Sequence, residues 1–125
     1  MEPNDIELRD DISVSDFLDM QRRLQAQFSG KWTPLTPDHG RSSLLWMIEE
    51  IGEAAAVIKK RGEAQIMSDP AVREAFIEEF ADVMMYFYDA LLCYGVDAAE
   101  FSRIYINKHN RNMLRDYENE RAYKS

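Results

Sequence analysis

The chain has 125 residues, which suits a single domain that buries about two thirds of the surface exposed by its unfolded form. Hydrophobic residues make up 46% and charged residues 30%, a composition typical of globular proteins. Acids outnumber bases 23 to 15, and this balance argues against a general binder of nucleic acid polymers or anionic membranes. Acids interrupt every long apolar run, and the acidic N-terminus does not resemble a signal peptide, so we expect a cytoplasmic protein.

The N-terminal part of the chain predicts an arm, a helix and a loop. Residues 1–12 are acidic and lack periodicity, so we expect a loose arm there. Apolar residues then recur at helical spacing, in a helix that begins near Ser13 or Ser15, either of which can cap it. Gly30 ends this helix, and a proline predicts a loop over residues 31–36.

A second helix follows directly. Thr36 and Pro37 are typical of a helix start, although Gly40 can delay it. Gly62 is the expected terminator, because it follows three basic residues that complement the negative end of the helix dipole. We expect a connection over residues 62–68.

The third predicted helix is unusually hydrophobic. Asp69 and Pro70 predict its start, and it runs to Tyr94. Large apolar side chains cover most of its circumference, and such a helix must be buried on all sides. A single chain of this length can hardly enclose it, so we predict a homo-oligomer, most simply a dimer.

A capping box of Asp97 and Glu100 predicts a fourth helix over residues 98–116. We expect the tail, residues 117–125, to fray. No segment shows the alternation of a strand. The sequence therefore predicts one all-α domain over residues 1–125, a four-helix bundle that forms homo-oligomers.

Acidic residues lie within the apolar runs of the second and third helices. Glu50 and Glu53 lie about 60° apart on one helical face, and Glu79 and Asp82 repeat this three-residue spacing. Antiparallel helices with such pairs could bring four carboxylates together, which repel one another unless protons or cations intervene. Oxygen ligands favour Mg²⁺ first and Mn²⁺ second. The alternative is that each pair belongs to an ordinary solvated face.

The fourth helix has a polar stripe of its own. Lys108, Arg111, Asn112 and Arg115 follow the i, i+3, i+4, i+7 rule and so share one face. In an acidic protein, such a stripe is a plausible surface for a triphosphate. A solvated face, paired with acids nearby, is the alternative.

These motifs together resemble those of the MazG-like all-α nucleoside triphosphate pyrophosphohydrolases, whose relatives include all-α dUTPases and dCTP pyrophosphatases. The matching stretches are EEIGEAAAVIK (49–59), EEFADVMMYF (78–87) and the basic stripe, which is similar to a Lys-x-x-Lys-Asn-x-x-Arg signature. The chain has arginine at the second basic position of that signature. The resemblance covers roughly residues 38–116 and implies a four-helix MazG-like fold.

The resemblance also implies roles for individual residues. Mg²⁺ ligands would be Glu50, Glu53, Glu79 and Asp82, and the catalytic carboxylates would be Glu49, Glu50 and Glu53, with Glu49 as a proton acceptor. Substrate-binding residues would be His39, Arg41, Tyr86, Lys108, Arg111, Asn112 and Arg115. Weaker candidates are Trp32, which could stack on a base, and Asp89, which shares a face with Asp82. Trp46 is expected in the core.

The resemblance implies hydrolysis of a (deoxy)nucleoside triphosphate to the monophosphate and pyrophosphate, a housecleaning reaction of the nucleotide pool. No P-loop and no arrangement for a serine or cysteine nucleophile is present. Two alternatives stay open. One is the sister activity on phosphoribosyl-ATP, and the other is a non-catalytic helical oligomer that binds a nucleotide or a partner protein.

Overall fold

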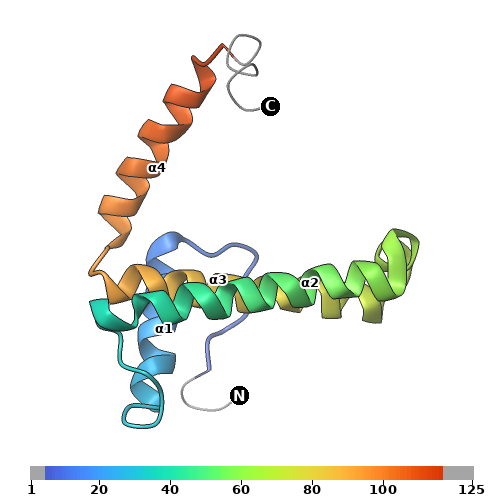
Figure 1. Cartoon of the computed structure of the whole chain (residues 1–125), viewed down its shortest axis with the longest axis horizontal. Coiled ribbons are helices and arrows are strands. Elements are labelled where there is room, and N and C mark those ends of the chain that lie inside the picture. Colours follow the sequence, from blue (N-terminus) through green and yellow to red (C-terminus); the bar gives the residue numbers. More distant parts are fainter. Residues whose placement is uncertain (1–4, 117–125) are drawn as a thin grey trace.

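The protein is all-helical over the residues that its computed structural model describes, 5–116 (Figure 1). In chain order these are α1 (Val14–Gln27), the 3₁₀ turn η1 (Pro37–His39), α2 (Gly40–Ser68), α3 (Pro70–Cys93) and α4 (Ala98–Met113). Residues 5–116 contain no strand, and no helix among them is long and apolar enough to cross a membrane. The predicted all-α class with four helices is confirmed, whereas the predicted frayed tail lies outside the described residues.

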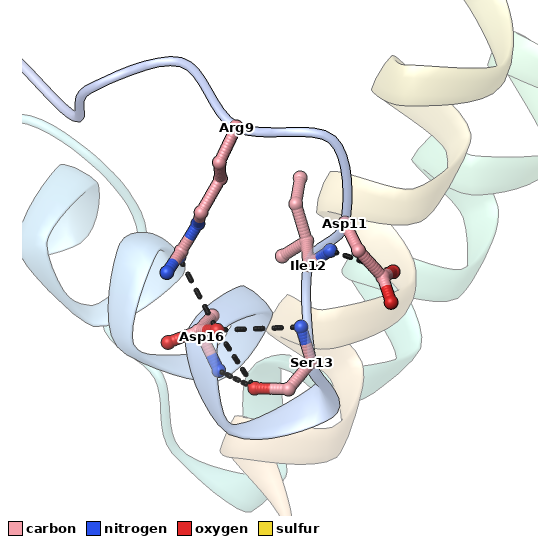
Figure 2. A network of polar contacts seen from close by, with 5 residues as sticks. All are labelled: Arg9, Asp11, Ile12, Ser13 and Asp16. Atoms are coloured by element: carbon pink, nitrogen blue, oxygen red, sulfur yellow. Dashed lines mark hydrogen bonds and ion pairs between the residues drawn. The ribbon is translucent and has the colours of Figure 1, made fainter.

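The start of α1 is fixed by a capping box (Figure 2). The Ser13 hydroxyl accepts a hydrogen bond from the Asp16 amide at 3.1 Å, and the Asp16 carboxylate accepts one from the Ser13 amide at 3.3 Å. Arg9 adds an ion pair to the same carboxylate at 3.2 Å, which links the N-terminal arm to the helix. These contacts lower the pKa of Asp16, the Ser13 hydrogen bonds most strongly. Of the two serines that the sequence offers as a cap, Ser13 is therefore the one that begins the helix.

The end of α2 differs from the prediction. Gly62 does interrupt the regular helix, with φ 81° and ψ 159°, but the chain resumes helical geometry and continues to Ser68. The prediction of a non-helical connection over 62–68 is therefore wrong for the residues after the glycine. The segment from Glu63 consists largely of good helix formers, and Ile66 is only 5% exposed, so burial holds this extra turn against the core.

Helices α2 and α3 form an antiparallel hairpin that is the body of the molecule, and α1 crosses one end of it (Figure 1). Asp69 caps α3 by accepting a hydrogen bond from the Ala71 amide at 3.0 Å. Phe17 of α1 stacks on Tyr88 of α3, with ring centroids 4.9 Å apart. The most deeply buried apolar side chains are Leu18, Ala54, Ile66, Tyr88, Ala90 and Cys93. Most of them lie where α1 meets the hairpin.

Helix α4 is not packed alongside the other three. Its first turns touch the rest of the chain, with Phe101 against Phe87 at 5.5 Å between centroids, and it then projects away from the hairpin (Figure 1). The prediction that all four helices form one bundle is therefore not realised within a single chain. The described part of α4 contains no fully buried residue. The side chains of α4 bury too little apolar surface to hold this helix alongside α2 and α3.

Helix α3 also leaves much of its apolar surface uncovered. Ile77 and Phe80 are 52% and 50% exposed, and Met84 and Met85 are also exposed. They line a groove of about 1190 Å³ between α1 and α3. The hydrophobic circumference that the sequence shows is therefore only partly buried by this chain.

Candidate metal and nucleotide site

Three carboxylates from the two hairpin helices meet near the middle of the hairpin. Glu50 comes from α2, whereas Glu79 and Asp82 come from α3, and each offers an oxygen within 4.8 Å of the other two. The antiparallel pairing places them together, because it sets the middle of α2 opposite the middle of α3. Glu50 and Glu79 are half-buried and Asp82 is exposed, so the group opens to solvent on one side.

This proximity changes the acidity of Glu50. Burial of its carboxyl group raises its pKa, and the negative charges of Asp82, Glu79 and Glu53 raise it further. A side-chain hydrogen bond with Glu79 contributes in the same direction. None of the charged groups that shift the pKa of Glu50 is positive, so no cationic side chain among them balances the carboxylates. A bound cation would relieve this repulsion and favour the ionised carboxylates.

The other two predicted acids, the metal ligand Glu53 and the catalytic acid Glu49, lie outside this group of three. Glu53 is outside the group of three carboxylates and is exposed, although its charge acts on Glu50. It lines a hollow of about 280 Å³ between α2 and α3, together with Glu79, Lys60 and Arg61. Glu49 is exposed, and its charge acts on the Tyr86 hydroxyl. The structure therefore brings together three of the four predicted metal ligands.

Tyr86 connects the acidic cluster to a pocket beside it. Its ring contacts Trp46 across the hairpin, with centroids 5.8 Å apart and planes tilted by 51°. Burial raises the pKa of the Tyr86 hydroxyl, and the charges of Glu50 and then Asp89 add to this shift. Tyr86 therefore lies beside both the acidic cluster and the pocket, and its predicted role in substrate binding stays a prediction.

The pocket has a volume of about 310 Å³ and is lined by the loop after α1 and by α1, α2 and α3. The residues around it are Gln25, Lys31, Trp32, Thr33, Pro34, Leu35, Ser43, Trp46, Tyr86 and Asp89. The sequence analysis considered Trp32 and Asp89 but placed Trp46 in the core, which is wrong because this side chain is 37% exposed and lines the pocket. A signal was present, since Ser43, Trp46 and Glu50 follow the i, i+3, i+7 rule on one helical face.

His39 and Arg41 lie before and within the first turn of α2, and neither lines this pocket. The His39 ring nitrogen Nδ1 is 2.8 Å from the Thr36 hydroxyl and 3.5 Å from the Asp38 carboxylate. These contacts stabilise the 3₁₀ turn. The geometry gives His39 a structural role within the chain.

The basic stripe is separated from the acids. Lys108, Arg111, Asn112 and Arg115 follow α4 to its end and beyond, where the helix projects away from the hairpin (Figure 1). Lys108 and Arg111 are exposed. The Asn112 oxygen Oδ1 is buried and accepts no hydrogen bond within the described part of the chain. One chain therefore does not bring the stripe and the carboxylates to a common ligand.

The donor set suits a hard divalent cation. All three converging groups are carboxylates, and Mg²⁺ and Mn²⁺ prefer such oxygen ligands, whereas zinc and iron sites usually include histidine or cysteine. Water molecules and phosphate oxygens would complete the coordination, as is usual for Mg²⁺. The residues present therefore fit a magnesium site that is open to a phosphorylated ligand.

Comparison with known proteins identifies no relative. No protein-family model, no curated protein and no solved structure matches the chain.

Proposed function

We propose that the protein is a Mg²⁺-dependent nucleoside triphosphate pyrophosphohydrolase. The observation that carries the proposal is the convergence of Glu50, Glu79 and Asp82 from two antiparallel helices, beside a pocket walled by aromatic rings. The acids suit a metal-bound polyphosphate, and the rings suit a nucleobase. The resemblance of these segments to MazG-like motifs points to the same activity.

In the proposed reaction, water attacks the α-phosphorus and the bond between this phosphorus and the bridging oxygen of the β-phosphate breaks. The products are a nucleoside monophosphate and pyrophosphate. Bound Mg²⁺ would neutralise triphosphate charge and lower the pKa of water. Glu50, Glu79 and Asp82 would hold the cation, and Glu53 would join them from the rim of the cluster. Glu49 would accept the proton of the attacking water.

We further propose that a second copy of the chain completes the site. Within the described residues no ion pair joins Lys108 or Arg111 to a carboxylate of the hairpin, so these two side chains would act on the triphosphate bound by a neighbouring chain. Exposed apolar surface supports such an assembly, because Phe80 and Ile77 on α3 lack cover within the chain. A dimer would bury these faces.

The activity is tested by pyrophosphate release from a panel of (d)NTPs and phosphoribosyl-ATP, with Mg²⁺ and a coupled pyrophosphatase. Glu50→Gln and Asp82→Asn should each reduce kcat/KM by at least about a hundredfold, if the carboxylates hold the catalytic cation. Glu78→Gln is the matched control, because this exposed acid lies next to Glu79 on α3 but is not one of the three converging carboxylates. Full activity of the Glu50 and Asp82 variants would remove the metal assignment.

The separation of the basic stripe from the carboxylates favours one other candidate, a non-catalytic oligomer that binds a nucleotide or a partner protein. Such a protein would show saturable binding of a nucleotide with Mg²⁺ but no release of pyrophosphate from any substrate. The same panel therefore distinguishes the two functions.

A further inference from the structure

Asp89 and Gln25 form a polar end of the 310 Å³ pocket, and Gln21 contacts Asp89 from outside the pocket lining. Gln21 donates a hydrogen bond from Nε2 to one Asp89 oxygen at 2.9 Å, and Gln25 donates from Nε2 to the other oxygen at 3.3 Å. Asp89 and Gln21 are each only 5% exposed. Among the described residues, no ion pair joins Asp89 to a cation.

Each Asp89 oxygen accepts one hydrogen bond and has the capacity to accept another. An ionised carboxylate has about four acceptor sites, and the two glutamines use only two of them. Gln25, which lines the pocket together with Asp89, has a side-chain carbonyl oxygen as a further acceptor. Burial raises the pKa of Asp89, although the two hydrogen bonds lower it in part. Lys31 also lines the pocket, but no ion pair of the described residues joins it to Asp89. A buried carboxylate at a pocket wall suits a ligand with N–H donors.

The position of Asp89 relative to the metal cluster fits a nucleotide. Asp82, Tyr86 and Asp89 follow the i, i+4, i+7 rule on α3, so they form one line along the helix. Seven residues advance about 10 Å along a helix axis, which resembles the span of a nucleotide from its α-phosphate to the far edge of its base. Tyr86 lies between the two ends, because both Glu50 and Asp89 act on its hydroxyl. The pocket is therefore correctly placed for a base.

The walls of the pocket suit a flat ring. Trp32 comes from the loop after α1, and Trp46 and Tyr86 face each other across the hairpin. Stacking on aromatic rings is favourable for every base and does not select among them. Selection must therefore come from the polar end.

We propose that this pocket receives the nucleobase and that Asp89, held by Gln21 and Gln25, selects bases with an exocyclic amino group. The inference rests on the proposed function and deepens it. Cytosine, adenine and guanine each offer an amino donor to these acceptors. Uracil, thymine and hypoxanthine present a carbonyl oxygen at the position of the cytosine or adenine amino group. Two acceptors would then face each other in a buried site, which is strongly unfavourable.

Matched substrate pairs test the proposal. The pairs dCTP and dUTP, and dATP and dITP, each differ by an amino group in place of a carbonyl oxygen. The wild-type enzyme should favour the amino member of at least one pair by about tenfold or more in kcat/KM, and the oxo member of neither. Asp89→Asn replaces an acceptor by an amide donor of the same shape, so it should reduce that ratio by about tenfold or invert it. Gln25→Met removes one acceptor with little change in volume and should reduce the ratio in the same direction if the Asp89 variant does not fold.

Asp19→Asn is the matched control, since Asp19 is an exposed acid on α1 that pairs with Arg22 at 2.8 Å. It should leave every ratio unchanged.

The possible failures are distinguishable. If no triphosphate is hydrolysed, the proposed function fails and this inference fails with it. If triphosphates are hydrolysed but the wild-type enzyme shows no preference or favours dUTP and dITP, only the base assignment is overturned. A clear amino preference that survives in both Asp89→Asn and Gln25→Met would exclude this end of the pocket as its source.

Discussion

Glu50 and Glu79 belong to different helices, yet their carboxylate oxygens lie within 4.8 Å of each other. Their side-chain hydrogen bond and their mutual repulsion both raise the pKa of Glu50. Two acids in such contact favour either a shared proton or a bound cation. Protons and cations therefore compete for these carboxylates, and this competition should change the stability of the folded protein measurably.

Divalent cations should stabilise the folded protein through this cluster. A ligand that binds only the folded state adds about 2.7 kcal/mol at a hundredfold excess over its dissociation constant. Thermal unfolding with MgCl₂ or MnCl₂, compared with EDTA, should therefore show a rise in Tm. Glu50→Gln should lose most of this rise, whereas Glu78→Gln should keep it. Equal rises in the two variants would place the cation elsewhere.

Without metal, the contribution of Glu50 to stability should depend on pH in a defined direction. The unfolded chain titrates Glu50 near the ordinary pKa of 4.5, and the folded chain titrates it at a higher pKa. Between these values the folded state binds more protons, so the free energy of unfolding falls as pH rises. Glu50→Gln lacks this contribution.

Urea unfolding in EDTA from pH 4.5 to about 8 should therefore show the wild type losing stability relative to Glu50→Gln as pH rises. Saturating Mg²⁺ should reverse the trend, because the cation binds the ionised carboxylates. A difference between the two proteins that stays constant over this range would contradict the raised pKa.

Glycine should be required at the interruption of α2. Gly62 has φ 81° and ψ 159°, a conformation that is essentially restricted to glycine, so Gly62→Ala should destabilise the protein by about 1–3 kcal/mol. Gly52 is the matched control within the same helix, because a Cβ there meets no atom within 4 Å. Gly52→Ala should increase stability by up to about 1 kcal/mol through helix propensity. Chemical denaturation of both variants checks this, and changes of the same sign would contradict it.

Complementation between chains tests whether the basic stripe acts on a neighbouring site. Co-expressed Glu50→Gln and Arg111→Ala chains with different tags should form mixed oligomers that are more active than either variant alone. In a two-fold dimer, random mixing would restore about a quarter of the sites. Glu50→Gln with Asp82→Asn is the control that should not complement, because α2 and α3 of one chain form the carboxylate cluster. Mixed oligomers that show no gain in activity would mean that the basic stripe does not act on the site of a neighbouring chain.

The candidate site was predictable where it depends on periodicity within one helix. Glu79 and Asp82 are three residues apart, so they share one face of α3. The antiparallel hairpin then brings Glu50 of α2 to them. Glu53 follows the same spacing but lies at the rim. The pocket beside the acids was less predictable, because Trp32, Trp46 and Asp89 come from three separate segments.

The sequence by itself determined the helices of this protein, since caps, prolines and glycines act within a few residues of where they occur. Ser13 begins α1, Asp69 begins α3 and Asp97 begins α4 through local hydrogen bonds to backbone amides. Only the tertiary structure decided what those helices bring together. The helix after Gly62 persists because Ile66 is buried. The basic stripe lies apart from the acids because α4 leaves the hairpin after its first turns and has no buried residue (Figure 1). Burial depends on all the elements at once, and no spacing within one helix specifies it.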